Sequence, residues 1–354
     1  MKFFRAFIIV VLSISFWGGI KRDEGYWYEQ GVQQMNLGNY QEALKYFNEA
    51  IKMNPDFDIA WFEKGILYKK WGNRKEAIKC FDKAIALNSK FAKAWYEKGL
   101  IMGSLRKYEE EIHCYDMALG IDIDYAESWC SKGMVLEKLG NYQEAINCFD
   151  KAIEKHPDYA KAWSWKGATL KKIKNEEEAV KCFNKAIECY DKALTINPED
   201  EESWCNKGIT FEKLGSYGEA IKCFDRAISI NPYYIDALLY KGITLGEAGK
   251  FDRAIPCYDT AISVDSNYPE VWCKKGDALV GLGKFKDAIP CYEKAIALSP
   301  NYLEARVGKG VALMKMGELK ESKSVLQRAH SLAEKEKNQK MLEKIDALLK
   351  ELKK

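Results

Sequence analysis

The chain has 354 residues, and its 55 basic and 52 acidic side chains leave a formal net charge of +3. A chain this close to neutrality has no overall field to draw it to nucleic acid or to a membrane surface. Length alone would fit two or three globular domains, but the internal repetition described below predicts one elongated array.

The first element is an apolar segment at the N-terminus. Lys2 and Arg5 precede an uncharged, mostly apolar run over residues 6–20. We expect residues 1–22 to be a signal peptide or a membrane anchor. As a helix the run would span roughly 22 Å, which is short for a bilayer core of about 30 Å, so a cleaved signal peptide and an uncleaved anchor both fit. An apolar helix that caps the following array is the other interpretation. The expected location is therefore at a membrane through this segment, and the alternatives are export after cleavage or a cytoplasmic protein.

A repeated pattern begins at residue 24 and returns in steps of 34 residues. Its clearest copy runs from Trp129 to Pro157, where apolar residues recur at helical spacing on both sides of Leu139-Gly140-Asn141. Each copy therefore predicts two amphipathic helices with a turn between them. Position 4 carries Trp in most copies, and position 8 always carries Gly. The position-8 glycines are Gly31, Gly65, Gly99, Gly133, Gly167, Gly208, Gly242, Gly276 and Gly310.

This pattern resembles the tetratricopeptide repeat over residues 24–336. The resemblance implies an all-α, right-handed superhelical solenoid of antiparallel helix pairs, closed by a C-terminal capping helix over residues 337–354. The nine copies are residues 24–57, 58–91, 92–125, 126–159, 160–200, 201–234, 235–268, 269–302 and 303–336.

Several copies depart from the pattern. Glu111 takes the position of a small Ala where two helices meet, so we expect it to loosen that joint or to point aside. Position 7, usually Leu in this family, is Lys in repeats two to nine. We expect the lysine stems to cover the core and the ammonium groups to reach water, and a row of ligand-binding lysines is the alternative. The ninth repeat matches the pattern less well, with Arg306 in place of the Trp, as is usual for a terminal repeat.

The fifth repeat contains a seven-residue insertion. Its segment CFNKAIE at residues 182–188 is followed by the near-copy CYDKALT. We expect a second helix about 10 Å longer than the others and an irregularity of the superhelix there. The inserted Cys189, Tyr190, Ala193 and Leu194 are expected to stay on nearly the same face as the first copy, because seven residues are close to two turns.

Eleven cysteines follow the repeat, and seven of them stand just before the aromatic residue of the second helix. Neighbouring helices lie about 10 Å apart, which is usually too far for a disulfide, so we expect buried free thiols. His113, His156 and His330 lack further ligands at metal-site spacing. No phosphate-binding, zinc-protease or nucleophile-elbow motif occurs in the sequence. The sequence predicts no enzyme, no cofactor and no metal, and its aromatic residues favour a core over a nucleic-acid platform.

The resemblance also implies a binding groove on the first helices, at repeat positions 2, 5, 9, 12 and 13. In repeats one to five these positions carry apolar anchors and basic residues, which are Tyr28, Phe62, Ile66, Tyr96, Lys69, Lys70, Lys93, Lys161, Lys171 and Lys172. In repeats six to nine they are mainly acidic, with Glu202, Glu212, Asp236, Glu247, Glu270, Asp277 and Glu304.

We therefore expect a scaffold for protein or peptide partners. One hypothesis is that the basic half receives an acidic amphipathic peptide or helix, and the alternative is that the charges are solvated and partners dock elsewhere. The clamp of chaperone-tail-binding members is not reproduced, because Tyr28 and Val32 occupy its positions in the first repeat. Ends of opposite charge would also permit head-to-tail self-association. The other functional class is a regulatory or substrate-recognition subunit of a multi-protein enzyme complex.

Overall fold

The structure is a computed structural model that describes residues 22–335 and 338–352. The apolar run at residues 6–20 lies outside the described residues, so the signal or anchor over residues 1–22 stays a prediction. None of the helices in the described part of the chain combines the length and the apolarity that crossing a bilayer requires.

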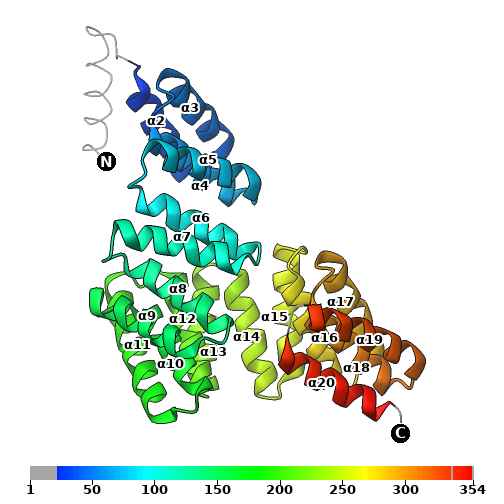
Figure 1. Cartoon of the computed structure of the whole chain (residues 1–354). Helices are drawn as coiled ribbons and strands as arrows, with labels where there is room; N and C mark the ends of the chain where they lie inside the picture. Colours follow the sequence, from blue (N-terminus) through cyan, green and yellow to red (C-terminus); the bar gives the residue numbers. More distant parts are fainter. Residues whose placement is uncertain (1–21, 336–337, 353–354) are drawn as a thin grey trace, which may run out of the picture. The chain divides into compact units, whose positions relative to one another are not determined.

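The described residues form 19 α-helices and no strand (Figure 1). Helices α2 to α19 are nine consecutive pairs, and each first helix has 13 residues. The first helices are α2 (Glu24–Asn36), α4 (Asp58–Lys70), α6 (Ala92–Ser104), α8 (Ala126–Lys138), α10 (Ala160–Lys172), α12 (Glu201–Lys213), α14 (Ile235–Glu247), α16 (Pro269–Gly281) and α18 (Leu303–Lys315). The second helices are α3 (Tyr40–Met53), α5 (Arg74–Leu87), α7 (Tyr108–Ile121), α9 (Tyr142–Lys155), α11 (Glu176–Ile196), α13 (Tyr217–Ile230), α15 (Phe251–Val264), α17 (Phe285–Leu298) and α19 (Leu319–Lys335), and α20 (Gln339–Glu351) ends the array.

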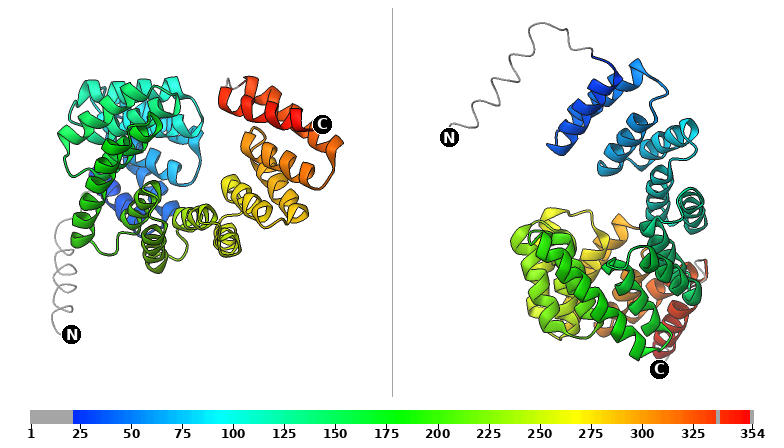
Figure 2. Two further views of the ribbon diagram at one scale, coloured as in Figure 1. Left: turned by 90° about the horizontal axis from the view of Figure 1, so that it is seen from below. Right: turned by 90° about the vertical axis from the view of Figure 1, so that its left-hand side faces the viewer.

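The chain divides into two compact units with their boundary between Pro157 and Asp158. Unit 1 contains α2 to α9, and unit 2 contains α10 to α20. Within each unit, consecutive helices pack against one another, both inside a pair and from one pair to the next (Figure 2). The expected all-α stack of antiparallel helix pairs is therefore confirmed within each unit.

The core of each pair is built around the position-8 glycine. A Cβ added to Gly133 would lie 2.6 Å from the ring of Phe149, and one added to Gly276 would lie 2.8 Å from the ring of Tyr292. Both rings are almost fully buried. Because interiors are close-packed, any larger residue on the first helix would push the ring out of its place. This contact explains why every copy has Gly at position 8.

The turn inside each pair requires a left-handed backbone conformation. Most copies place Gly there, as at Gly140 with φ of 84°. Repeats three and five instead place Arg106 and Lys174 there, with φ of 58° and 63°. Since a side chain in this region costs roughly 1–2 kcal/mol, these two turns carry strain that the glycine turns do not.

Helix α11 contains the duplicated heptad and has 21 residues, against 14 in α13. The expected lengthening is therefore confirmed, whereas the expected effect on the superhelix stays a prediction. Cys189, Tyr190 and Leu194 are buried, which agrees with their expected place on the face of the first copy, and Ala193 is exposed. The exposure of Ala193 does not bear on which face of the helix it occupies, because each heptad drifts by only about 20° on a straight helix.

Glu111 does not point aside, because it is buried with 6 % exposure. The expected loosening of the joint stays a prediction. Gly103 on α6 lies directly opposite and provides the space for the carboxyl group. The Tyr115 hydroxyl donates to Glu111 Oε1 at 3.0 Å. Glu111 Oε2 has no hydrogen-bond partner among the described residues. Burial raises the pKa of Glu111, and the hydrogen bond from Tyr115 opposes that shift.

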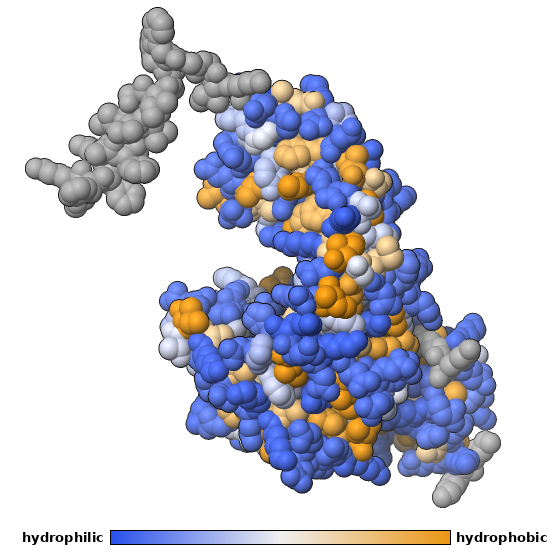
Figure 3. Space-filling model, turned by 60° about the vertical axis from the view of Figure 1, so that its left-hand side comes forward, coloured by the Kyte–Doolittle hydropathy of each residue, from blue (hydrophilic) through white to orange (hydrophobic). Residues whose placement is uncertain are grey.

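The cysteines are all buried free thiols, as expected. Burial raises the pKa of Cys80 to about 11, so this thiol stays protonated and unreactive at neutral pH. At the C-terminal end, Ile345 of α20 is fully buried in a cluster with Leu326 of α19, so α20 covers the apolar face that the last pair would otherwise expose. The surface seen in Figure 3 is largely hydrophilic, with hydrophobic residues in separate groups.

Candidate functional site

The residues predicted to bind a partner lie on first helices that touch one another within each unit. In unit 1, α2 contacts α4 and α4 contacts α6, while in unit 2 the helices α10, α12, α14, α16 and α18 are in contact in succession. We call the surface that these helices present the first-helix face of each unit. The predicted basic residues divide between the two faces, with Lys69, Lys70 and Lys93 in unit 1 and the others in unit 2.

The predicted apolar anchors of unit 1 belong mainly to the core. Position 5 packs against the aromatic residue that ends the same repeat, as the Phe62 and Phe91 ring centroids do at 4.8 Å. Phe62 is 2 % exposed and offers a partner almost no surface. Tyr28, Ile66 and Tyr96 are half-buried, so part of each side chain reaches the face.

Two glutamates that the sequence interpretation missed lie among the lysines of unit 1. Lys69 Nζ is 2.6 Å from Glu97 Oε2. Burial raises the pKa of Glu63, while the charges of Lys93 and Lys70 lower it by less. Glu63 and Glu97 both stand at repeat position 6, beside the counted positions. Including that position would have revealed that this face carries both signs of charge.

Lys70 and Lys93 remain exposed, and each places its ammonium group over an aromatic ring. Lys70 Nζ lies 5.8 Å from the Tyr40 ring centroid, and Lys93 Nζ lies 5.5 Å from the Phe62 centroid. Such contacts contribute about 0.5–1 kcal/mol at exposed sites. They orient the two lysines without neutralising them.

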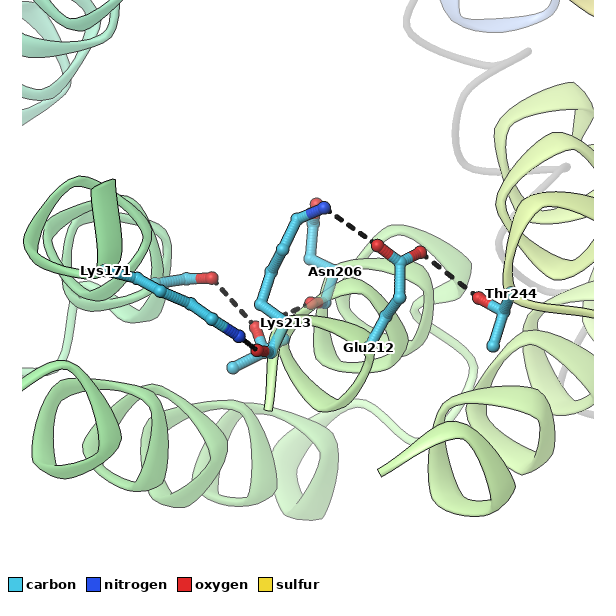
Figure 4. A network of polar contacts seen from close by, with 7 residues as sticks. Lys171, Asn206, Glu212, Lys213 and Thr244 are labelled. Atoms are coloured by element: carbon cyan, nitrogen blue, oxygen red, sulfur yellow. Dashed lines mark hydrogen bonds and ion pairs between the residues drawn. The ribbon is translucent and has the colours of Figure 1, made fainter. Parts of the chain in front are cut away.

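In unit 2 a polar network ties α10, α12 and α14 together (Figure 4). Lys171 Nζ donates to the main-chain oxygen of Lys213 at 2.8 Å. Glu212, which is 5 % exposed, accepts from Lys213 Nζ at 2.8 Å and from Thr244 Oγ1 at 3.1 Å. Both Lys171 and Glu212 were predicted to face a partner, yet their bonds within the chain hold neighbouring first helices in place.

The remaining predicted residues at this end of unit 2 lie on α10 and α12. Lys161 is half-buried and Lys172 is exposed at the end of α10. Glu202 is exposed in the first turn of α12, where a negative charge is favoured by the helix dipole. These side chains come from two neighbouring first helices of opposite charge.

Further along unit 2, position 2 carries a row of carboxylates at Asp236, Glu270 and Glu304. Burial raises the pKa of Glu270, and the negative charges of Asp236 and Glu304 raise it further, whereas Lys274 lowers it. Glu270 therefore experiences repulsion from the carboxylates on both sides of it. A cation placed among them would relieve this repulsion.

Two hollows open on the same stretch of the first-helix face. The one of about 220 Å³ lies among α14, α15 and α16. The other, of about 330 Å³, lies among α16, α17, α18 and α20. The first is lined by Ile243, Gly246, Glu247, Phe251, Tyr258 and Ala278, and the second by Val280, Tyr292, Glu304, Val307, Gly308, Val311, Met341 and Lys344, while Lys274 and Asp277 line both.

Asp277 is held where the two hollows meet. The Tyr292 hydroxyl donates to Asp277 Oδ1 at 2.8 Å, and Lys274 Nζ lies 3.7 Å from Oδ2. Tyr292 is the ring that packs on Gly276 in the core, so the core of the pair fixes a carboxylate of the groove. The first hollow therefore combines apolar lining residues with two carboxylates and one lysine, and the second with two carboxylates and two lysines.

The position-7 lysines are bonded within the chain. Lys98 Nζ is 2.7 Å from Asp82 of the preceding repeat and 5.2 Å from the ring centroid of Trp95. The same pairing occurs in other repeats. It is kept across the insertion, where Lys207 pairs with Asp191 of the duplicated heptad. The Lys98 side chain is 20 % exposed and its ammonium group is paired, and such ion pairs argue against a ligand-binding row.

The described part of the chain holds no group of three or more His, Cys, Asp or Glu side chains that could bind a metal ion. His330 lies 3.3 Å from Asp346 and 3.7 Å from Glu334, which places it in a contact between α19 and α20. We find no constellation of nucleophile and base on either first-helix face.

Family models match most of the array. A model described as Tetratricopeptide repeat matches residues 26–57, 59–91, 126–159 and 201–234. A second, described as TPR repeat, matches residues 181–215, 245–283 and 276–317, and a third, also described as Tetratricopeptide repeat, matches residues 148–181. Together the matched segments cover more than half of the chain. No curated protein matches it.

Solved structures also resemble the chain. A crystal structure of MamA is 24% identical and has a TM-score of 0.43, covering 47% of this chain and 96% of its own. Another crystal structure of MamA protein is 22% identical with a TM-score of 0.44, covering 50% and 97%. A crystal structure of YrrB, described as a TPR protein with an unusual peptide-binding site, is 24% identical with a TM-score of 0.37, covering 55% and 97%.

Proposed function

The chain belongs to the tetratricopeptide repeat family, and from this premise we propose that it is a non-catalytic scaffold whose first-helix faces hold segments of partner proteins. Stacked repeats create extended surfaces suited to such binding. The proposed groove is basic in repeats one to five and acidic in repeats six to nine.

The observation that carries this proposal is the pair of hollows in unit 2, which lie beside carboxylates of the first-helix face. Their floors contain Tyr258, Val280 and Val311, and Glu247, Asp277 and Glu304 stand at their edges. A basic amphipathic segment would place apolar side chains in the hollows and its Lys or Arg residues beside the carboxylates. Lys274 and Lys344 also line the second hollow, so the segment would need a matching acidic or neutral residue there.

The basic part of the groove is proposed to receive an acidic segment. Exposed Lys70 and Lys93 support this proposal. Lys69 and Lys171 support it less, because each already bonds within the chain. The acidic stretch of unit 2 is therefore the stronger of the two surfaces.

Binding of defined peptides to charge-reversal variants tests the proposal. Two labelled amphipathic peptides with the same apolar spacing are compared, one bearing Lys and the other Glu. We expect the double variant Glu247→Lys, Glu304→Lys to bind the basic peptide at least about tenfold more weakly and the acidic peptide with unchanged affinity. Charges at the edge of a binding site act through their complementarity to the ligand. The matched control, Lys70→Glu with Lys93→Glu, should affect only the acidic peptide.

Equal effects of both variants on both peptides would contradict the proposal. So would binding that is indifferent to added salt, which screens exposed charges. An enzymatic activity that appears only when the scaffold is bound to a catalytic chain would favour the regulatory or substrate-recognition role instead.

We also propose that residues 1–22 direct the scaffold to a membrane, on the support of the apolar run and its flanking basic residues. Fractionation of cells that express the full chain or a chain starting at Asp23 tests this, and an equal distribution of both chains would overturn it. Head-to-tail self-association is a further proposal. Sedimentation should then reveal larger species at low salt that dissociate as salt is added.

A further inference from the structure

The last repeat carries a second kind of surface, away from the acidic stretch described above. Two adjoining hollows of about 290 and 330 Å³ open among α17, α18 and α19. Arg306 and Arg328 line both of them. We call the two hollows together the arginine hollow. Its floor is apolar, with Ile296, Val325 and Leu332.

The arginine hollow exists because position 4 has changed from an aromatic ring to a cation, while position 26 keeps a cation. In the fourth repeat, position 4 is Trp129 and position 26 is Lys151, whose Nζ lies 4.2 Å from the indole centroid. In the ninth repeat the same positions are Arg306 and Arg328. A cation over an aromatic ring is an attractive contact, whereas two guanidinium groups repel each other. The exchange therefore replaces a filled, favourable contact by a hollow with two like charges.

Arg306 is held in place by the hydrogen bond that Trp makes elsewhere in the chain. The indole N–H of Trp272 donates to the carbonyl oxygen six residues earlier, at 2.9 Å. Arg306 donates two hydrogen bonds to the main-chain carbonyl oxygen of Pro300, one from Nε at 3.2 Å and one from Nη2. A guanidinium has five N–H donors. Because Pro300 takes two of them, three are left for a ligand. The side chain is thus fixed without being neutralised.

The other charges of the arginine hollow are unevenly compensated. Lys309 Nζ lies 2.7 Å from Glu293 and 3.5 Å from Glu321, so it is already paired. The part of the hollow near Pro300 is also lined by Lys335, Ser331 and Asn301, and among described residues its lining includes no carboxylate. Three cationic side chains, one hydroxyl and one amide therefore surround a space without an anion.

We propose that the arginine hollow binds a phosphate group carried by a phosphorylated segment of a partner protein. A carboxylate has two oxygens and one charge, whereas a phosphate ester presents three acceptor oxygens and up to two charges. Guanidinium groups match phosphate geometry with paired N–H donors. The concave shape and the apolar floor fit a side-chain stem that carries the phosphate, whereas a bilayer surface favours a cluster of four to eight basic residues.

Titration of the full chain with phenyl phosphate and with benzoate, followed by NMR of the arginine Nε–H signals, tests the site directly. We expect phenyl phosphate to bind at least about tenfold more tightly than benzoate and to shift the Arg306 and Arg328 signals. Arg328→Ala should weaken binding at least about tenfold. The matched control is Arg226→Ala, which changes the same repeat position in the sixth repeat, where Trp204 is retained.

A second variant separates loss of binding from loss of folding. Arg306→Trp restores the residue of most other repeats, so the fold should be kept while the hollow is filled and binding is lost. The proposal is overturned if benzoate binds as tightly as phenyl phosphate, or if Arg226→Ala weakens binding as much as Arg328→Ala. Arg328-dependent binding to phosphatidic acid vesicles without binding of phenyl phosphate would assign the surface to a membrane and would also overturn it.

Discussion

The first-helix faces of the two units follow the same repeat pattern but differ in how their charges are used. In unit 1, Lys69 is paired with Glu97, and Glu63 lies near Lys70 and Lys93. In unit 2 burial and the negative charges of Asp236 and Glu304 raise the pKa of Glu270, and hollows open on the same stretch of the face. The comparison teaches that the sign of a groove depends on which charges lack compensation, and not on how many charges its positions carry.

The largest effects should come from the core, where the two units are alike. Phe149→Ala in unit 1 and Phe224→Ala in unit 2 each remove a fully buried ring that packs on a glycine. We expect each to lower the free energy of unfolding of its unit by about 3–5 kcal/mol. Denaturant unfolding of both variants checks this. If only one of the two variants lowered the free energy of unfolding, the claim that both units are packed in the same way would be contradicted.

Replacing the buried carboxyl of unit 1 should come next in size. Glu111→Gln should raise the free energy of unfolding by about 1–2 kcal/mol at pH 7, because it removes a buried charge that has one unsatisfied oxygen. Denaturant unfolding near pH 7 and near pH 4.5 measures the effect.

The sign of the pH dependence follows from the raised pKa of Glu111. The folded state keeps this proton to a higher pH than the unfolded state does, so the parent chain loses stability as the pH rises from about 4.5 toward neutrality. The advantage of Glu111→Gln should therefore shrink in acid. Exposed Glu110, which pairs with Lys107, supplies the control Glu110→Gln, and an equal gain there would contradict this account.

A smaller gain is expected at the strained turn of the fifth repeat. Lys174→Gly should stabilise unit 2 by about 1 kcal/mol, since Gly adopts the left-handed conformation without a Cβ clash. Lys174→Ala keeps the Cβ and should give no such gain. Thermal unfolding of the two variants compares them, and an equal gain from Ala would show that the turn is not strained.

The smallest effect on stability should come from the ion pair of unit 1. Lys69→Gln is expected to cost about 0.5 kcal/mol, because a partly exposed pair contributes little. It leaves Glu97 without its lysine and makes this face more like that of unit 2. The labelled basic peptide should then gain affinity for unit 1 at low salt, and unchanged binding would weaken the comparison.

Much of the fold followed from the period of the sequence, because each glycine and aromatic pair recurs in a fixed place. Other features depended on residues that face each other across helices. Burial of Glu111 required Gly103 on another helix, and the neutralisation of Lys69 required Glu97 from the next repeat. The hollows result from the sizes of several side chains on separate helices, so a count of charges along one helix could not reveal them.

The central claim is that a partner segment binds the acidic stretch of the first-helix face of unit 2, over α14, α16 and α18. Amide hydrogen exchange of the full chain, with and without the labelled basic peptide, tests it most directly, because it reports which helices a ligand stabilises. We predict slower exchange in α14, α16 and α18, and no change in α4 and α6. Slower exchange confined to α4 and α6, or none in either group while the peptide is bound, would contradict the claim.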